Sequence, residues 1–259
     1  MAHVFNQDLS ELSPWILAEV QHGEDLATGS AGPHVRRAQE WLSLHGHGVV
    51  VDGDFGPATE RAVQAFQNDA GLIDSGQVDE ATFTTLVTPM IDVLRQGLNA
   101  SVPIAQALLD YADAHLSAQP REVGGPNSGP WVRLYMSGRE GGQFAWCAGF
   151  VTFLLDQAAQ SLEVDKPIAG SVSCDVLAAQ ATRAGTLLDE TAAPGTVTPG
   201  SIFLVRRIPG DWTHTGVITA VAGDTFDTIE GNTNDAGHRE GTEVCARTRA
   251  YPGKDFILL

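Results

Sequence analysis

The spacing of apolar residues changes once along the chain, near Gly200. Before this glycine, apolar positions recur every three or four residues in several segments, which predicts amphipathic helices. Beyond it, short segments alternate apolar and polar positions and are separated by Gly, Pro, Asp and Asn, which predicts strands. Helices followed by antiparallel strands indicate an α+β fold.

The pattern also divides the chain into domains. We expect an N-terminal arm or short helix at 1–27, a small domain of three helices at 28–90, a linker at 91–102 and a second domain at 103–259. The elements expected in the second domain are helices near 103–118, 131–136, 146–160 and 174–183, and strands near 201–206, 215–221, 225–230, 242–247 and 256–258.

The small domain carries a series of motifs with fixed spacing. Val35 to Leu42 reads VRRAQEWL, Val51 to Gly56 reads VDGDFG, and Thr59 opens the next apolar segment. Together with the Gly71-Leu72 break, these motifs resemble the peptidoglycan-binding domain of type 1. The resemblance implies a helical module that binds bacterial cell-wall polymer, and a purely structural module is the alternative.

Composition narrows the classes of partner. The formal net charge of −17 argues against nucleic acid, whose binding depends on Lys and Arg contacts with phosphates. No apolar run approaches the roughly 18 residues of a membrane span. The N-terminus lacks a basic region followed by an apolar core, so no Sec-type signal peptide is expected. No CxxC or HExxH spacing is present, and we expect neither a metal nor another cofactor.

Three positions in the second domain suggest chemistry. Cys147 opens an apolar helix, where the helix dipole and free N–H groups favour a thiolate, although a buried structural cysteine is the alternative. His214 opens a strand, and Glu230 and Asn232 lie two apart near the end of the next strand, so they are expected on one face. Either Glu230 or Asn232 could orient the imidazole. Cys174 and Cys245 are expected to be separate thiols, with a disulfide between them as the alternative.

The order of these residues resembles the CHAP family of amidohydrolases and peptidases, which have a papain-like core. The carriers are the WCAGFV run at Cys147, the THTGVI run at His214 and the IEGN run at Glu230, and the loop at 122–130 also resembles one branch. The resemblance implies that Cys147 is the nucleophile, His214 the base and then acid, Glu230 its orienting partner and Asn232 a further polar site residue. Four neighbours are expected to bind substrate, each with a structural alternative: Gly142, Gln143, Trp146 and Trp212.

Together the two resemblances imply a bacteriolytic peptidoglycan hydrolase. We expect a cysteine-dependent amidase or endopeptidase that cleaves an amide bond through an acyl-enzyme. The alternatives are a non-catalytic wall-binding protein and a cysteine peptidase acting on proteins. The expected partner is bacterial peptidoglycan. An inhibitor or immunity protein, or a release system, is left open as a further partner. The chain is expected to be a monomer. The expected place of action is the wall or periplasm of a target bacterium, reached as a phage endolysin or through a specialised secretion system.

Overall fold

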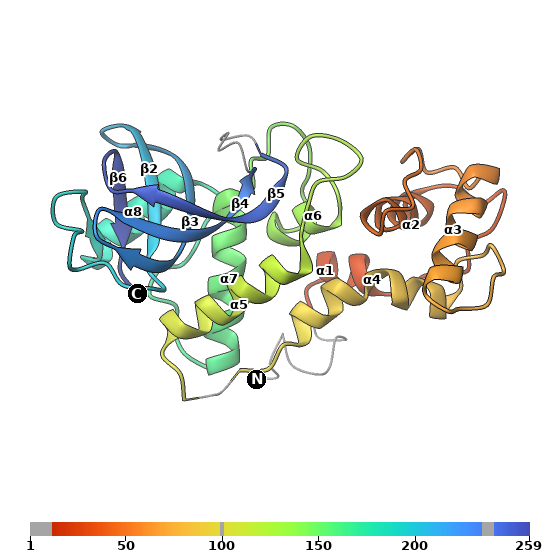
Figure 1. Cartoon of the computed structure of the whole chain (residues 1–259), viewed down its shortest axis with the longest axis horizontal. Coiled ribbons are helices and arrows are strands. Elements are labelled where there is room, and N and C mark those ends of the chain that lie inside the picture. The colour runs from red at the N-terminus through yellow and green to blue at the C-terminus, as the bar shows by residue number, and fades with distance from the viewer. Residues whose placement is uncertain (1–11, 99–100, 235–240) are drawn as a thin grey trace. The chain divides into compact units, whose positions relative to one another are not determined.

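The computed structural model describes residues 12–98, 101–234 and 241–259 (Figure 1). The chain divides into two compact units. We call residues 12–94 and 121–142 the helical unit, and residues 95–120 and 143–259 the sheet unit.

The helical unit contains five helices. They are α1 (Pro14–Val20), α2 (Pro33–Leu44), α3 (Pro57–Asp69), α4 (Glu80–Arg95, whose last residue is assigned to the sheet unit) and α6 (Pro130–Tyr135). All but α4 begin with proline, which has the right φ for a first turn and lacks an N–H that would have no partner there. Helices α2 and α3 contact one another, and the residues of their apolar faces are buried, among them Val35, Trp41, Val63 and Phe66.

The buried amide of Gln39 fixes the turn that follows α2. Its Nε2 donates to Asp52 Oδ1 at 2.8 Å, to the Asp54 carbonyl at 3.1 Å and to Thr59 Oγ1 at 3.1 Å. Its Oε1 accepts from the backbone N–H groups of Asp52 and Gly53 at 3.1 and 2.8 Å. One side chain thus holds a loop against the start of α3, which explains a polar group in a core.

Gln67 has the same role in the next helix, α3. Its Nε2 donates to Ser75 Oγ, to the Gln77 carbonyl and to Thr82 Oγ1, and its Oε1 accepts from the Gly76 N–H at 2.9 Å. The helical unit therefore uses one arrangement twice, in which a buried glutamine secures a glycine turn and a threonine of the following helix.

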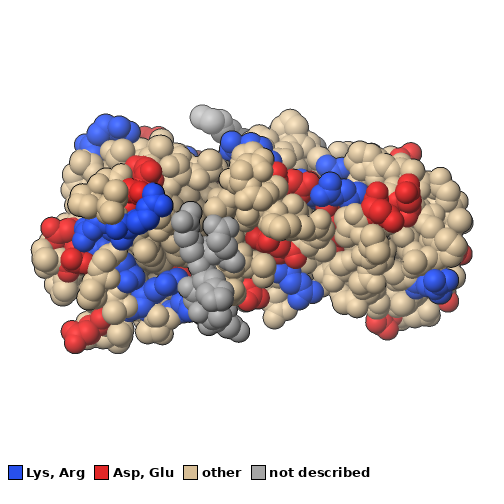
Figure 2. Space-filling model, turned by 90° about the horizontal axis from the view of Figure 1, so that it is seen from above, with Lys and Arg blue, Asp and Glu red and all other residues tan. Residues whose placement is uncertain are grey.

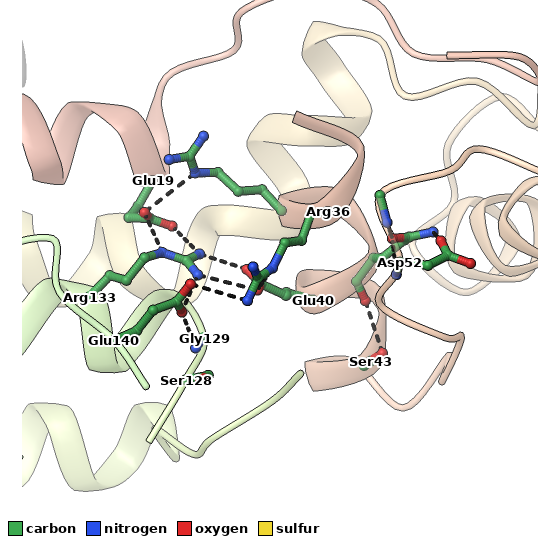
Figure 3. Close-up of polar contacts among 12 residues, drawn as sticks. Glu19, Arg36, Glu40, Ser43, Asp52, Ser128, Gly129, Arg133 and Glu140 are labelled. Atoms are coloured by element: carbon green, nitrogen blue, oxygen red, sulfur yellow. Dashed lines mark hydrogen bonds and ion pairs between the residues drawn. The ribbon is translucent and has the colours of Figure 1, made fainter. Parts of the chain in front are cut away.

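A buried ion cluster joins α6 to α1 and α2 within the helical unit. Figure 3 shows the guanidinium of Arg133 among the carboxylates of Glu19, Glu40 and Glu140. Its Nε and Nη2 donate to Glu19 at 2.8 Å each, Nη2 donates to Glu40 at 2.6 Å and Nη1 to Glu140 at 2.7 Å. Burial would lower the pKa of Arg133, but hydrogen bonds to Glu19 and Glu40 raise it above its ordinary value.

This cluster shows where residues 121–142 belong. We expected them in the second domain, before the cysteine helix, yet they lie in the helical unit. Arg133 is 114 residues from Glu19 and 93 from Glu40 in sequence, so no local pattern could reveal the pairing. The limits of the two compact units differ from the domain limits given above, which stay a prediction.

The sheet unit consists of three helices and one antiparallel sheet. The helices are α5 (Ile104–Ala118), α7 (Cys147–Leu162) and α8 (Cys174–Ala184). The strands are β1 (Leu187–Leu188), β2 (Ile202–Ile208), β3 (Asp211–Ala222), β4 (Thr225–Thr233), β5 (Glu243–Ala250) and β6 (Lys254–Ile257). Their order is β1-β6-β2-β3-β4-β5. Helix α7 packs against β3 and β4, and α5 packs on α7 (Figure 1).

An aromatic cluster contributes to the sheet unit's core. Phe226 lies 5.2 Å from Tyr251, 5.4 Å from Phe256 and 5.7 Å from Phe203 between ring centroids. Tilted and edge-on pairs at these distances add to the burial energy of each ring, about 2–3 kcal/mol per side chain. The cluster holds β2, β4 and β6 together beside the strand that carries His214.

The predicted α+β class is confirmed. The helices and five of the six strands lie close to their expected positions, and the two-residue β1 was not expected. Helix α4 differs, because it runs unbroken through Pro89 to Arg95, whereas the sequence predicted a linker with a short separate helical segment at 90–98. Six apolar side chains beyond Phe83 are buried along it, and this burial outweighs the hydrogen bond that the proline removes. They are Leu86, Val87, Met90, Ile91, Val93 and Leu94.

No helix within the described residues is long and apolar enough to cross a membrane. Acidic and basic side chains stand next to one another over much of the face shown in Figure 2. The net charge of −17 is therefore accompanied by local pairing of charges, as in Arg207 with Asp211.

Candidate functional site

The start of α7 is held in place by the end of β4. Cys147 is the first residue of α7 and is 4% exposed. The backbone N–H of Trp146, just before it, donates to Asn232 Oδ1 at 3.1 Å. A Cβ on Gly231 would lie 2.7 Å from the Trp146 ring and 2.8 Å from Phe150 Cβ, so only glycine permits this approach. The backbone of β4 at Gly231 thus packs directly against the side chains of Trp146 and Phe150 at the start of α7.

His214 and Glu230 form a buried pair on neighbouring strands. His214 Nε2 lies 2.8 Å from Glu230 Oε2, and the two residues are 4% and 0% exposed. Gly216 provides the room, since a Cβ there would lie 2.7 Å from Glu230 Cγ. Gly216 thus leaves space for the carboxylate that contacts the imidazole.

Glu230 is held by more than the imidazole. Arg249 Nε donates to Oε1 at 2.7 Å, Arg249 Nη2 donates to Oε2, and Thr228 Oγ1 donates to Oε1 at 2.6 Å. Burial would raise the pKa of Glu230, but Arg249 and His214 lower it to about 2. An ionised carboxylate can only accept, so Nε2 of His214 carries the proton of this hydrogen bond.

The thiol and the imidazole shift one another's pKa. Burial would lower the pKa of His214, but the nearby Cys147 thiolate and the hydrogen bond to Glu230 raise it to about 9. A hydrogen bond from Cys174 lowers the pKa of Cys147 well below its usual value, burial opposes this, and His214 lowers it further. The favoured state is therefore a thiolate beside an imidazolium. His214 Nδ1, the nitrogen not used by Glu230, is buried and makes no hydrogen bond of ordinary geometry within the described residues.

A second thiol completes the cluster. Cys174 is the first residue of α8, and its Sγ lies 4.0 Å from Cys147 Sγ. Cys147 and burial both raise the pKa of Cys174, so it keeps its proton while Cys147 gives up its own. None of the three cysteines forms a disulfide. The alternative pairing of Cys174 with Cys245 is therefore absent, and Cys174 contacts Cys147 instead.

Asn232 does not lie where strand alternation places it. We expected it on one face with Glu230, where either residue could orient His214. In the structure Asn232 has φ of 56°, and the pairing of β4 with β5 shifts register between Glu230 and Thr233. Its amide bonds Trp146 and the Gly241 carbonyl. Glu230 contacts the imidazole, and Asn232 supports the start of α7.

The four expected substrate-binding residues are placed differently from one another. Gln143 is exposed and precedes the site in the sheet unit. Gly142 is exposed and belongs to the helical unit. Trp146 is 0% exposed, which corrects its expected role, because a fully buried indole offers no surface to a polymer. Trp212 is half-buried, and its Nε1 donates to Asp255 at 2.7 Å.

Sequence reasoning missed Cys174, Arg249 and Thr228 as members of the cluster. Thr228 lies two residues before Glu230 on one strand, so alternation could have suggested it. Arg249 lies on β5, and its contact with Glu230 depends on strand pairing. Cys174 reaches the site from another helix, which no local spacing indicates.

The arrangement can carry out acid–base chemistry at a carbonyl. An imidazolium held by a buried carboxylate can deliver a proton to a leaving amine. A thiolate at a helix start is polarised by the helix dipole and by the imidazolium.

Two known proteins resemble segments of this chain. The zinc D-Ala-D-Ala carboxypeptidase of Streptomyces albus G is 41% identical over 64 residues, which is 24% of this chain and 25% of that protein. The chain thus matches about a quarter of that relative's length. A solved structure from Clostridium acetobutylicum, a fused zinc-dependent amidase/peptidase with a peptidoglycan-binding domain, is 27% identical, covering 39% of this chain and 48% of that one at a TM-score of 0.25.

The name of the Streptomyces albus G relative contradicts one expectation. We predicted a cysteine-dependent enzyme, whereas this relative is named as a zinc carboxypeptidase, so the predicted enzyme class is wrong by this comparison. The relatives named above do not show the expected CHAP family or its papain-like core.

The donor set of the described residues does not suit zinc. Structural and catalytic zinc sites need at least three side-chain ligands of the His, Cys, Asp or Glu type. Among residues 12–98, 101–234 and 241–259, no three such side chains are placed to hold a metal ion. In the cluster, His214 Nε2 is already bonded to Glu230, and both Glu230 oxygens are bonded to Arg249. These donor and acceptor atoms are therefore already bonded within the cluster.

The helical unit has a clearer relationship. The family model of the peptidoglycan binding domain matches residues 31–86. These residues contain α2, α3 and the start of α4, together with the two glutamine-fixed turns. The predicted peptidoglycan-binding domain of type 1 is confirmed, and residues 31–86 are a domain of that family.

Proposed function

We propose that this chain binds bacterial peptidoglycan through its helical unit and hydrolyses an amide bond of that polymer in its sheet unit. The family match at 31–86 supports the binding half. The relatives' names, an amidase/peptidase and a D-Ala-D-Ala carboxypeptidase, support an amide bond as the target. The cell wall is accordingly the proposed place of action.

The proposed site consists of Cys147, His214, Glu230 and Asn232. The observation that supports this site is the 2.8 Å contact of His214 Nε2 with the fully buried Glu230. In this cluster the pKa of His214 is raised and that of Glu230 is lowered. Buried titratable groups with opposed shifts mark functional sites more often than structural ones. The thiol of Cys147 at the start of α7 and His214 on β3, the strand against which α7 packs, support a papain-like arrangement as part of the proposal.

Each residue has a role that its contacts define. His214 is the proton carrier and protonates the amine that leaves the cleaved amide. Glu230 keeps Nε2 protonated and directs Nδ1 away from the carboxylate. Cys147 is the charge partner of the imidazole and lies with it at the proposed reacting centre. Asn232 is a positioning residue, since it bonds the backbone before Cys147.

Digestion of purified sacculi tests the proposal. The full chain, Cys147→Ala and His214→Ala are compared, with Cys245→Ser as the matched thiol control, and soluble fragments are identified by mass spectrometry. We expect release by wild type and Cys245→Ser, and a loss of about 10²-fold or more in the two site variants. Retained sedimentation with sacculi shows that the variants still bind, and circular dichroism with an unchanged unfolding midpoint shows that their sheet unit still folds.

The outcomes separate the two halves of the proposal. If wild type releases no fragment while still binding sacculi, the chain is a wall-binding protein without hydrolase activity. Equal release by wild type and His214→Ala would remove the site. A parallel digestion with a zinc chelator measures metal dependence directly: release that stops on chelation but persists in both site variants would move the reaction to a metal site elsewhere in the chain.

A further inference from the structure

The sheet unit contains a pair of thiols, of which the proposed hydrolysis uses only Cys147. Cys147 opens α7 and Cys174 opens α8, and their sulfur atoms are 4.0 Å apart. The two helices therefore direct their N-terminal ends at one point. Sulfur atoms at this separation are in van der Waals contact, and a disulfide needs them to approach to about 2.05 Å.

We propose that Cys147 and Cys174 form a redox modification site, in which a hydroperoxide oxidises the dithiol to a disulfide. The inference rests on the geometry of the two thiols and does not depend on the proposed hydrolysis. A disulfide would close a loop of the chain between two helix starts whose thiols are already in contact.

The two thiols differ in their readiness to lose a proton, as this oxidation requires. Oxidation by a hydroperoxide begins at a thiolate, and Cys147 is the one whose pKa is lowered. Cys174 keeps its proton beside it and is placed to be the resolving thiol. Each residue retains a few per cent of exposure, 4% for Cys147 and 6% for Cys174, and hydrogen peroxide is close to water in size.

The step balances with hydrogen peroxide as the oxidant. The Cys147 thiolate attacks one peroxide oxygen, the O–O bond breaks, and a sulfenic acid and hydroxide are formed. The Cys174 sulfur then attacks the sulfenic sulfur, the S–O bond breaks, and the thiol proton leaves with that oxygen as water. In total two thiols and one peroxide give one disulfide and two waters.

Cys245 provides an internal comparison. It lies on β5, is more exposed than the other two and is not in a disulfide. Exposure alone would make it the first thiol to react, whereas the geometry favours Cys147 with Cys174. The two possibilities give different products from the same protein.

The experiment treats the full-length chain with one to five equivalents of hydrogen peroxide, followed by alkylation in denaturant and mass spectrometry. We expect a loss of 2 Da, one alkylated cysteine in place of three, and a peptide that joins residues 147 and 174. Dithiothreitol should restore three alkylated cysteines. Cys245→Ser should still form the bond, and Cys174→Ser should instead give a dimedone-reactive or over-oxidised Cys147.

Two results would overturn the inference. One is three alkylated cysteines at every peroxide dose, and the other is a disulfide that includes Cys245. Circular dichroism and the unfolding midpoint of Cys174→Ser establish that this variant is folded. Because the product is read by mass, an inactive hydrolase would leave the result interpretable, and a failure of the dithiol would leave the proposed hydrolysis standing.

Discussion

His214 Nε2 donates to Glu230 Oε2 at 2.8 Å, and this pair is nearly closed off from solvent. The carboxylate also accepts from Arg249 and Thr228, so it stays ionised. The contact keeps the proton on Nε2, so Nδ1 is the nitrogen whose proton the imidazolium can give up. Nδ1 is therefore the nitrogen available to a thiol or a substrate.

Replacing Glu230 with glutamine tests this relationship. The substitution keeps the shape of the side chain but removes the charge that favours imidazolium. The pKa of His214, about 9 in the wild type, should fall by one unit or more, as read by NMR of the imidazole carbons. Release of fragments from sacculi should fall by at least tenfold. Asp227→Asn, at an exposed carboxylate of the same strand, should change neither. An unchanged His214 pKa in Glu230→Gln would contradict the assigned role.

The same carboxylate predicts a dependence of stability on pH. Its pKa is lowered from 4.5 to about 2 by folding, so its contribution is present above pH 4.5 and is lost as the pH falls through 2. The full shift corresponds to roughly 3 kcal/mol, of which about 2 kcal/mol is lost between pH 5 and pH 3. Urea unfolding at these two pH values should show a smaller change in Glu230→Gln than in wild type. Equal changes in the two proteins would mean that Glu230 does not carry this contribution.

The ion cluster of Arg133 makes a prediction for the helical unit. Arg133→Met leaves Glu19 and Glu40, both almost fully buried, without their main cation. The free energy of unfolding of this unit should fall by about 3–5 kcal/mol, because an uncompensated buried charge is costly. Arg36→Ala is the matched control, since Arg36 belongs to the same cluster but its side chain is 41% exposed. It should cost less than about 1 kcal/mol.

Differential scanning calorimetry of the full chain measures both variants, with binding to sacculi as a second readout. Equal losses in Arg133→Met and Arg36→Ala would show that burial does not govern the cluster. The result also tests whether residues 121–142 stabilise the peptidoglycan-binding domain.

Gly231 predicts a packing effect on the site. The methyl group of Gly231→Ala would lie within 3 Å of Trp146 and Phe150, so the start of α7 has to shift. We expect a loss of about 1–3 kcal/mol in unfolding free energy and a marked loss of hydrolysis. Gly97→Ala is the control, because a Cβ there meets no atom within 4 Å. Full activity and stability in Gly231→Ala would show that the turn before Cys147 tolerates displacement.

Local pattern was sufficient for most elements of the chain. Helical spacing located α2, α3, α5, α7 and α8, and alternation located five strands, because these signals depend on neighbours within about ten residues. It failed at α4, where burial of apolar residues after Pro89 carries the helix on to Arg95. It also failed at Asn232, where a left-handed backbone ends the alternation.

The order of residues was enough to identify the chemical groups and their local setting: a thiol at a helix start, a histidine at a strand start, a carboxylate on the next strand and the motifs of the peptidoglycan-binding domain. The partners of these groups emerge only when the chain is folded. Glu230 rather than Asn232 contacts His214, Cys174 lies against Cys147, and Arg133 joins the helical unit. Each of these depends on strand register or on contacts between residues far apart in the chain, and local spacing contains neither.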